Sequence, residues 1–127
     1  MKNDKRLVFL EKAFKALSDQ TRLRIIGLLR NGEVCVCDMH GSLGLPQPTV
    51  SRHLAYLRNA GLVATRKEGL WVHYRLAELP DPVMQAVLDA VTHAIGHVDA
   101  GERDRKRLAS LVELTPISNE PRPRCCC

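Results

Sequence analysis

Two cysteines separated by a single residue, Cys35 and Cys37, are the side chains of this 127-residue chain that most directly suggest chemistry. They lie where a short helix is predicted to begin, and the dipole of a helix favours the thiolate form of a cysteine in its first turn. Thiolate sulfur selects soft and borderline ions. Residues i and i+2 point about 200° apart on a regular helix, so a small ion bound to both cysteines would distort that turn.

A pair of thiolates is an incomplete ligand set for either a three-coordinate metalloid or a four-coordinate zinc-like ion. A third ligand is therefore expected, and the candidates are His40, Cys125, Cys126, Cys127 and a small thiol from solution. Five cysteines in two clusters do not have the even, dispersed spacing of a secreted disulfide framework. The alternative interpretation is structural: Cys35 and Cys37 cap and pack as small apolar residues, and the terminal cysteines form an oxidation-prone end.

Apolar residues at helical spacing predict the elements that position these side chains. Helices are predicted over residues 4–17, 22–30 and 35–43, and a fourth follows residues 45–48 and ends near residue 60. Two strands at 63–67 and 70–76 flank a turn at Glu68 and Gly69, and a last clear helix spans 83–98. Residues 101–114 are expected to continue as a charged helix, and residues 115–127 as a flexible tail.

The order of these elements predicts a mainly helical protein with a β-hairpin, the winged helix-turn-helix, in the order α-α-α-α-β-β-α. Residues 1–100 are expected to form one DNA-binding and dimerisation domain, and residues 101–127 a C-terminal extension that ends in cysteines. Cys35 is placed at the N-cap of the third helix with Asp38 three residues later, like a capping box with a thiol in place of the hydroxyl. A homodimer through the first and last helices is expected, because their apolar stripes exceed what one small core can cover.

The second helix of a helix-turn-helix enters the major groove with its outer face. With Val50, Leu54 and Leu57 facing the core, a helical wheel turns outward several side chains that can hydrogen-bond to base edges. The hairpin adds cationic side chains suited to the DNA backbone. A solvated surface without a ligand is the alternative interpretation. The predicted DNA-contacting residues are Gln47, Pro48, Thr49, Ser51, Arg52, His53 and Asn59 in the helix and Arg66, Lys67, His73 and Arg75 in the hairpin.

The composition agrees with a polyanionic partner such as double-stranded DNA, since the formal net charge is +5 and the pI is about 9.2. No stretch approaches the ~20 apolar residues of a membrane span, and the first residues lack the apolar run of a secretory signal. A cytoplasmic location is therefore expected.

The chain has no phosphate-binding loop and no C-x-x-C pair outside its terminal run, so an enzyme is not expected. A thiol redox enzyme that uses the C-terminal cysteines is the alternative from a different class.

The sequence resembles the arsenic-responsive repressor (ArsR) family of bacterial winged-helix metal sensors over residues 9–76. The resemblance is carried by an ordered set of segments: ALSDQTRL at 16–23, EVCVCDM at 33–39, QPTVSRHL at 47–54, LRNAGLV at 57–63 and WVHYRL at 71–76. The Cys-Val-Cys-Asp box at 35–38 is similar to the arsenite and antimonite site of one branch of the family. The resemblance implies a homodimeric repressor that leaves its operator when As(III) or Sb(III) binds, with no organic cofactor.

The sequence departs from the family's branches at informative positions. The arsenite branch usually has a third cysteine three residues after the second, and His40 stands there in this chain. A branch that senses cadmium, lead or zinc adds N-terminal cysteines, and a zinc branch has a D-x-H pattern on the last helix, where this chain has Val91 two residues after Asp89. The spacing of His93 and His97 allows them to hold an ion together, but is more typical of a helix surface or a dimer seam. A cadmium-, lead- or zinc-responsive repressor of the same fold is the alternative function within this class.

Overall fold

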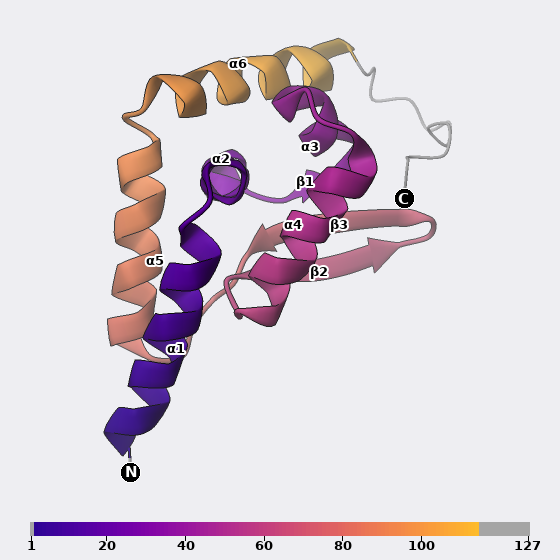
Figure 1. The fold of residues 1–127 in the computed structure, drawn as a ribbon. Helices are drawn as coiled ribbons and strands as arrows, with labels where there is room; N and C mark the ends of the chain where they lie inside the picture. Colours follow the sequence, from indigo (N-terminus) through magenta and orange to yellow (C-terminus); the bar gives the residue numbers. More distant parts are fainter. Residues whose placement is uncertain (1, 115–127) are drawn as a thin grey trace.

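A computed structural model of the chain describes residues 2–114 (Figure 1). The segment predicted as a flexible tail, residues 115–127, lies outside the described residues, and Cys125, Cys126 and Cys127 lie in it. The elements are α1 (Lys2–Leu17), α2 (Gln20–Leu28), a 3-10 turn η1 (Leu29–Asn31), β1 (Val34–Cys35), α3 (Val36–Leu43), α4 (Gln47–Asn59), β2 (Val63–Glu68), β3 (Trp71–Leu76), α5 (Pro82–Ile95) and α6 (Asp99–Leu114). This order confirms the predicted winged helix-turn-helix.

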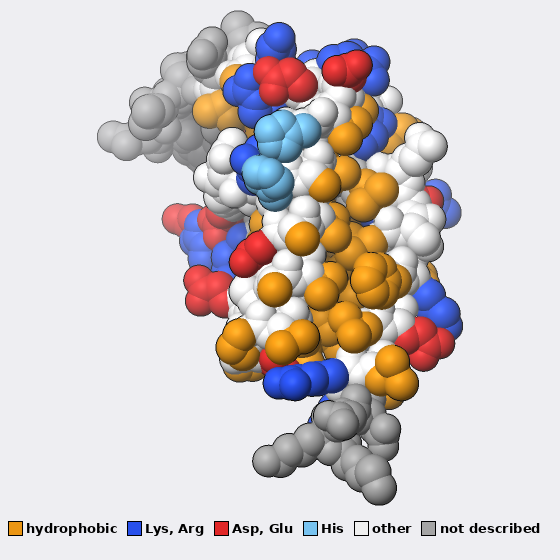
Figure 2. Space-filling view, turned by 90° about the vertical axis from the view of Figure 1, so that its left-hand side faces the viewer, with side chains coloured by type: hydrophobic (Ala, Val, Ile, Leu, Met, Phe, Trp, Pro, Cys, Tyr) orange, Lys and Arg blue, Asp and Glu red, His pale blue; other side chains and the backbone are white. Residues whose placement is uncertain are grey.

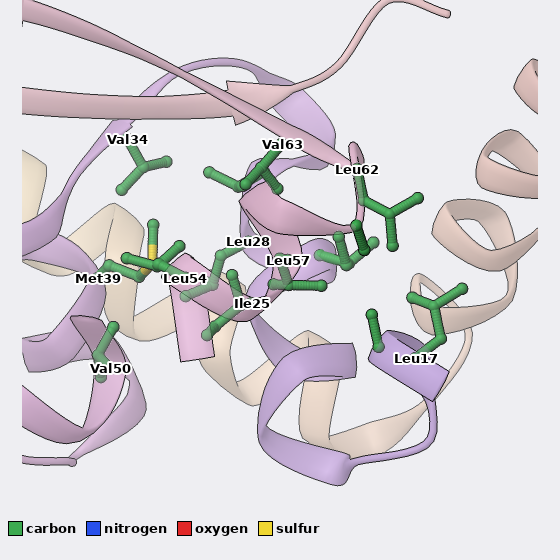
Figure 3. Packing of buried hydrophobic residues seen from close by; sticks show 14 of the residues in the cluster. Leu17, Ile25, Leu28, Val34, Met39, Val50, Leu54, Leu57, Leu62 and Val63 are labelled. Atoms are coloured by element: carbon green, nitrogen blue, oxygen red, sulfur yellow. The ribbon is translucent and has the colours of Figure 1, made fainter. Parts of the chain in front are cut away.

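The core lies between α2, α3 and α4, the three helices that the hairpin flanks on one side (Figures 1 and 3). Met39 of α3 and Leu54 and Leu57 of α4 are fully buried, as their helical spacing predicted. Ile25 of α2 packs in the same cluster. Burial of an aliphatic side chain of this size stabilises the fold by roughly 1.5–3 kcal/mol. The two helices of the helix-turn-helix are therefore held by a shared apolar core.

Helix α1 divides its apolar residues between the core and the surface. Its buried side chains are mainly the small Ala13 and Ala16, together with Leu17. Leu7 and Phe14 belong to the stripe predicted from helical spacing, yet they are 67% and 57% exposed. They contribute to a band of hydrophobic side chains over α1 and α5 (Figure 2). The single chain therefore leaves this band open to solvent.

The sheet has three strands in the order β1-β3-β2, with both pairs antiparallel. The hairpin agrees with the prediction to within one residue, and Gly69 occupies its turn with a φ of 60°. Strand β1 was not predicted, because two residues are too few to show a period of two. It pairs Val34 with Tyr74 and Cys35 with His73. The cysteine box is thereby joined directly to the hairpin.

Helix α6 confirms the charged helix predicted after residue 100 and crosses over α2 and α3 (Figure 1). The chain turns sharply between α5 and α6, where the α-carbon of Gly101 lies so close to the carbonyl of Ile95 that a β-carbon would collide with it. Asp104, which is 2% exposed, pairs with Arg24 of α2. None of the described helices is both long enough and apolar enough to cross a bilayer.

Candidate functional site

The cysteine box lies where β1 ends and α3 begins. Cys35 is the N-cap of α3, with an extended backbone (φ −73°, ψ 146°), and is 4% exposed. The predicted cap position is thus confirmed, but the thiol makes no capping hydrogen bond, so the likeness to a capping box was wrong in that respect. Cys37 lies in the first turn of α3 and is half-buried. A change at this turn acts on the helix that packs against the predicted recognition helix.

His40, one of the predicted third ligands, lies three residues after Cys37 on the same face of α3. Its Nδ1 is 3.3 Å from the carbonyl oxygen of Leu45, in the turn that leads to α4. Among residues 2–114, no three or more His, Cys, Asp or Glu side chains are grouped so that they could hold a metal ion. The residues that the structure describes thus bring no complete set of metal ligands together at the cysteine box.

A groove of about 500 Å³ opens beside the cysteine box. Cys35 and Val34 form part of its wall, Trp71 and His73 of β3 form another part, and Leu108 and Val112 of α6 close it on the side of the C-terminal helix. The groove is thus built from three elements that are far apart in the sequence. Neither the strand β1 nor the position of α6 over α3 was part of the sequence-based prediction.

The predicted recognition helix α4 begins after Pro46, which supplies no capping side chain. Within the first two turns, Gln47 donates a hydrogen bond from its Nε2 to the Oγ of Ser51, at 2.6 Å. The buried side of α4 is formed by the three residues predicted for it. Of the predicted DNA-contacting residues in this helix, Pro48, Arg52 and Asn59 are exposed, and Gln47, Thr49, Ser51 and His53 are half-buried.

Arg22 connects the predicted recognition helix to the end of α1. Its Nε donates a hydrogen bond to the carbonyl oxygen of Ala16 at 2.6 Å, and its Nη1 lies 3.3 Å from Nδ1 of His53. The guanidinium carbon is 4.2 Å from the ring centroid of Tyr56, which is a cation–π contact. Sequence reasoning missed this residue. The available signal was the pair of arginines, Arg22 and Arg24, in a helix whose other central residues are mainly apolar.

Asp19, the predicted N-cap of α2, accepts a hydrogen bond from the backbone N–H of Arg22 at 3.1 Å, which confirms the cap. This hydrogen bond lowers the pKa of the Asp19 carboxyl below its ordinary value, and the charges of Arg22 and His53 act in the same direction. Asp19 therefore adds a carboxylate to the group of side chains where α1, α2 and α4 meet.

The hairpin carries the remaining predicted DNA contacts, and their surroundings differ. Arg66 forms ion pairs with Glu33 and Glu68, and its hydrogen bonds lower the pKa of the Glu33 carboxyl. His73 is 22% exposed beside the same two carboxylates. Lys67 and Arg75 are exposed. The charge of Arg66 is therefore largely compensated within the protein, and no sequence pattern indicated its partner 33 residues away.

An ion pair with a buried carboxylate joins α6 to α2. Arg24 donates hydrogen bonds to both carboxylate oxygens of Asp104, at 2.9 and 2.8 Å. The same guanidinium donates to the carbonyl oxygen of Leu43, at the last residue of α3. Pairing with Asp104 raises the pKa of Arg24. Arg24 thus connects α2, the end of α3 and α6.

Comparisons with known proteins place these features in a family. Residues 19–65 match the model of a bacterial regulatory protein of the arsR family. The arsenic resistance transcriptional regulator ArsR1 of Pseudomonas putida is 42% identical over 106 residues, which cover 76% of this chain and 83% of that protein. The arsenical resistance operon repressor of Escherichia coli K12 is 57% identical over 65 residues, covering 50% of this chain and 56% of that protein.

A solved structure supports the same assignment. The homodimeric winged helix-turn-helix DNA-binding domain of Mb0332 from Mycobacterium bovis, described as a possible ArsR-family transcriptional regulator, aligns with a TM-score of 0.60 and 28% identity. The alignment covers 77% of this chain and 92% of that one. Since one relative exceeds 40% identity over most of its own length and the winged helix-turn-helix is present, this chain belongs to the arsR family of bacterial regulatory proteins.

Proposed function

We propose that this protein is a transcriptional repressor that binds operator DNA as a homodimer and leaves it when trivalent arsenic or antimony binds Cys35 and Cys37. The observation that carries the proposal is the position of Cys35. It is at once the N-cap of α3 and the residue paired with His73 of the hairpin. A soft ion bound to the cysteine box would therefore act on the hairpin and on α3, the helix that packs against α4.

Relatives named for arsenic resistance support a metalloid as the inducer. Thiolate ligands favour soft ions, and Cys35 and Cys37 are the two cysteines that we propose as ligands. We infer that the regulator acts without catalysing a reaction, in agreement with its family.

The third ligand is proposed to come from Cys125, Cys126 or Cys127. Helix α6 ends at Leu114, and Val112 in its last turn lines the groove beside Cys35. The ten residues 115–124 separate α6 from Cys125. An extended chain spans at most ~3.5 Å per residue, so they reach about 35 Å, which is ample for a return to the box. His40, whose imidazole is the weaker partner for arsenic, is the alternative third ligand.

Operator binding is proposed to use the outer face of α4 and the hairpin. Arg52, Asn59, Lys67 and Arg75 are exposed and offer direct contacts. Gln47, Pro48, Thr49 and Ser51 lie in the first two turns of α4, the part of a recognition helix that reaches base edges. His53, Arg66 and His73 already have partners within the protein, and we assign them a supporting role.

Release requires that the ion bind the conformation that does not bind DNA more tightly than the one that does. Cys35 is the extended N-cap and Cys37 lies in the first turn of α3, so we propose that bringing both sulfurs to one ion changes the backbone where β1 meets α3. By reciprocity, operator DNA must weaken ion binding by the same factor. A hundredfold change in either affinity corresponds to about 2.7 kcal/mol.

The test is release of a labelled operator during titration with As(III), Sb(III), Cd(II) and Zn(II). Cys35→Ser and Cys37→Ser should keep operator affinity and raise the half-maximal As(III) concentration at least about tenfold, a change of roughly 1.4 kcal/mol. Ser110→Ala on the exposed side of α6 is the matched control. Unchanged release of either cysteine variant by As(III) would overturn the site assignment, and release by Cd(II) or Zn(II) alone would favour the other metal-responsive repressor.

A further inference from the structure

A hollow of about 260 Å³ lies between the last two turns of α1 and the C-terminal end of α4. Lys12 and Lys15 of α1 form one wall, Tyr56 and Asn59 of α4 form the other, and Ala60 completes it. Lysine, tyrosine and asparagine are all side chains with which proteins bind the phosphates of DNA. Among the residues that the structure describes, no carboxylate lines this α1/α4 hollow.

The cations of the α1/α4 hollow are accessible to an anion. Lys12 is exposed. The Nζ of Lys15 lies 3.1 Å from an oxygen of Glu11, but the two side chains are 66% and 65% exposed, so the pair is weak and a phosphate can replace the carboxylate. The guanidinium of Arg22, 4.2 Å from the ring centroid of Tyr56, adds a further positive charge behind that ring.

The α1/α4 hollow adjoins the surface predicted to contact DNA. Asn59, one of the predicted DNA-contacting residues, belongs to both. Arg52 precedes Asn59 by two helical turns, so both exposed side chains lie on the same side of α4. When the first turns of a recognition helix reach base edges, as in homeodomains, its C-terminal end contacts the sugar-phosphate backbone. The hollow is therefore placed where a backbone phosphate passes.

A dimer through the hydrophobic band leaves the α1/α4 hollow open. Helix α1 lies between α5 and α4 (Figure 1). The band covers α1 and α5 and includes Phe14 (Figure 2). Lys12 precedes Phe14 by two residues and therefore points about 200° away from it, toward α4. Each protomer of such a dimer thus keeps its own hollow.

We propose that the α1/α4 hollow binds a backbone phosphate of operator DNA, with the ammonium group of Lys12 as the principal contact. The inference rests on the proposed function and adds α1 to the elements that hold the operator. Lys15 supplies a second cation, and the hydroxyl of Tyr56 and the amide of Asn59 supply hydrogen-bond donors. A phosphate carries no sequence information, so this contact strengthens binding and fixes the position of α4 on the DNA without adding specificity.

The test compares Lys12→Gln with Lys106→Gln, the same change at an exposed position of α6. A labelled operator and a duplex of unrelated sequence and equal length are titrated at several salt concentrations. Each phosphate contact contributes about 0.9 to the steepness of log affinity against log salt concentration, and a homodimer loses two contacts, so the slope for Lys12→Gln should become shallower by about 2. Lys106→Gln should keep the wild-type slope.

Two further readouts separate a phosphate contact from an indirect effect on α4. Operator affinity of Lys12→Gln at physiological salt should fall at least about tenfold, while the ratio of operator affinity to unrelated-duplex affinity stays at its wild-type value, because both duplexes lose the same contact. Lys12→Arg should restore both the affinity and the slope, since a guanidinium also binds phosphate.

The outcomes distinguish this inference from the proposed function. A wild-type salt slope for Lys12→Gln would overturn the inference and leave the proposed function standing. A lower ratio of operator to unrelated-duplex affinity with an unchanged slope would also overturn it, since Lys12 would then act through the position of α4. Failure of the wild type to bind any operator would instead refute the proposed function, and this inference with it.

Discussion

At the scale of single residues, Arg22 is the side chain whose geometry most directly links two functional helices. One edge of its guanidinium donates to carbonyl oxygens at the end of α1, those of Ala16 and Lys15. Its other contacts are His53 and Tyr56 of α4. Arg22 therefore connects α4 to the end of α1, and α1 is the helix that we assign to the dimer interface.

Replacing Arg22 by Lys should weaken operator binding about tenfold without changing the oligomeric state. A lysine keeps the charge but has neither the planar fork that donates to Ala16 nor the flat face that stacks on Tyr56. The measurement is an operator titration together with sedimentation of the free protein. Arg103→Lys, at an exposed position of α6, is the control. Wild-type operator affinity of the Arg22 variant would show that this contact does not position α4.

At the scale of elements, the predictions that succeeded rest on periodicity. The spacing of Val50, Leu54 and Leu57 indicated which side of α4 is buried, and the structure confirms it. Strand β1 has only two residues and was missed, although it joins Cys35 to His73. Local patterns also carry no information about distant partners.

The same limit applies to α6. Its charged sequence predicted a helix, but its place on the molecule depends on Asp104 and Arg24, which are 80 residues apart in the chain. The pattern of charges in α6 gave no sign that the Asp104 carboxylate is buried. For this reason the groove that α6 closes could not be predicted from the sequence.

Replacing Asp104 by Ala should destabilise the protein by roughly 2–3 kcal/mol and loosen α6. Removal of one partner from a fully buried ion pair costs about 3–5 kcal/mol, and the smaller value is expected because the Arg24 side chain is 28% exposed. The measurement is urea unfolding, with hydrogen exchange of α6 amides as the local readout. Asp99→Ala, at an exposed position of α6, is the control. Unchanged exchange in α6 would show that the ion pair does not hold this helix in place.

At the scale of the whole molecule, the hydrophobic band over α1 and α5 indicates how two copies assemble (Figure 2). Leu7, Val8 and Phe14 of α1 and Val83 of α5 are exposed in the single chain. An apolar band of this kind marks an interface. A twofold dimer would cover it and would place two copies of α4 so that they address the two halves of a palindromic operator.

Replacing Phe14 by Glu should therefore convert the dimer into a folded monomer with weak operator binding. The carboxylate would be buried without a partner in the dimer but remains in water in the monomer, so only association is penalised. A monomer contacts one half-site, so the slope of log affinity against log salt concentration should fall to about half its wild-type value. Val112→Glu adds the same charge to α6, outside the band, and should stay dimeric with an unchanged slope.

The measurement is sedimentation together with operator titrations at several salt concentrations, and circular dichroism verifies that the variants are folded. A Phe14 variant that remains dimeric and keeps the full salt slope would exclude this side of α1 from the interface, and the operator would then have to be read by a different arrangement of the two copies.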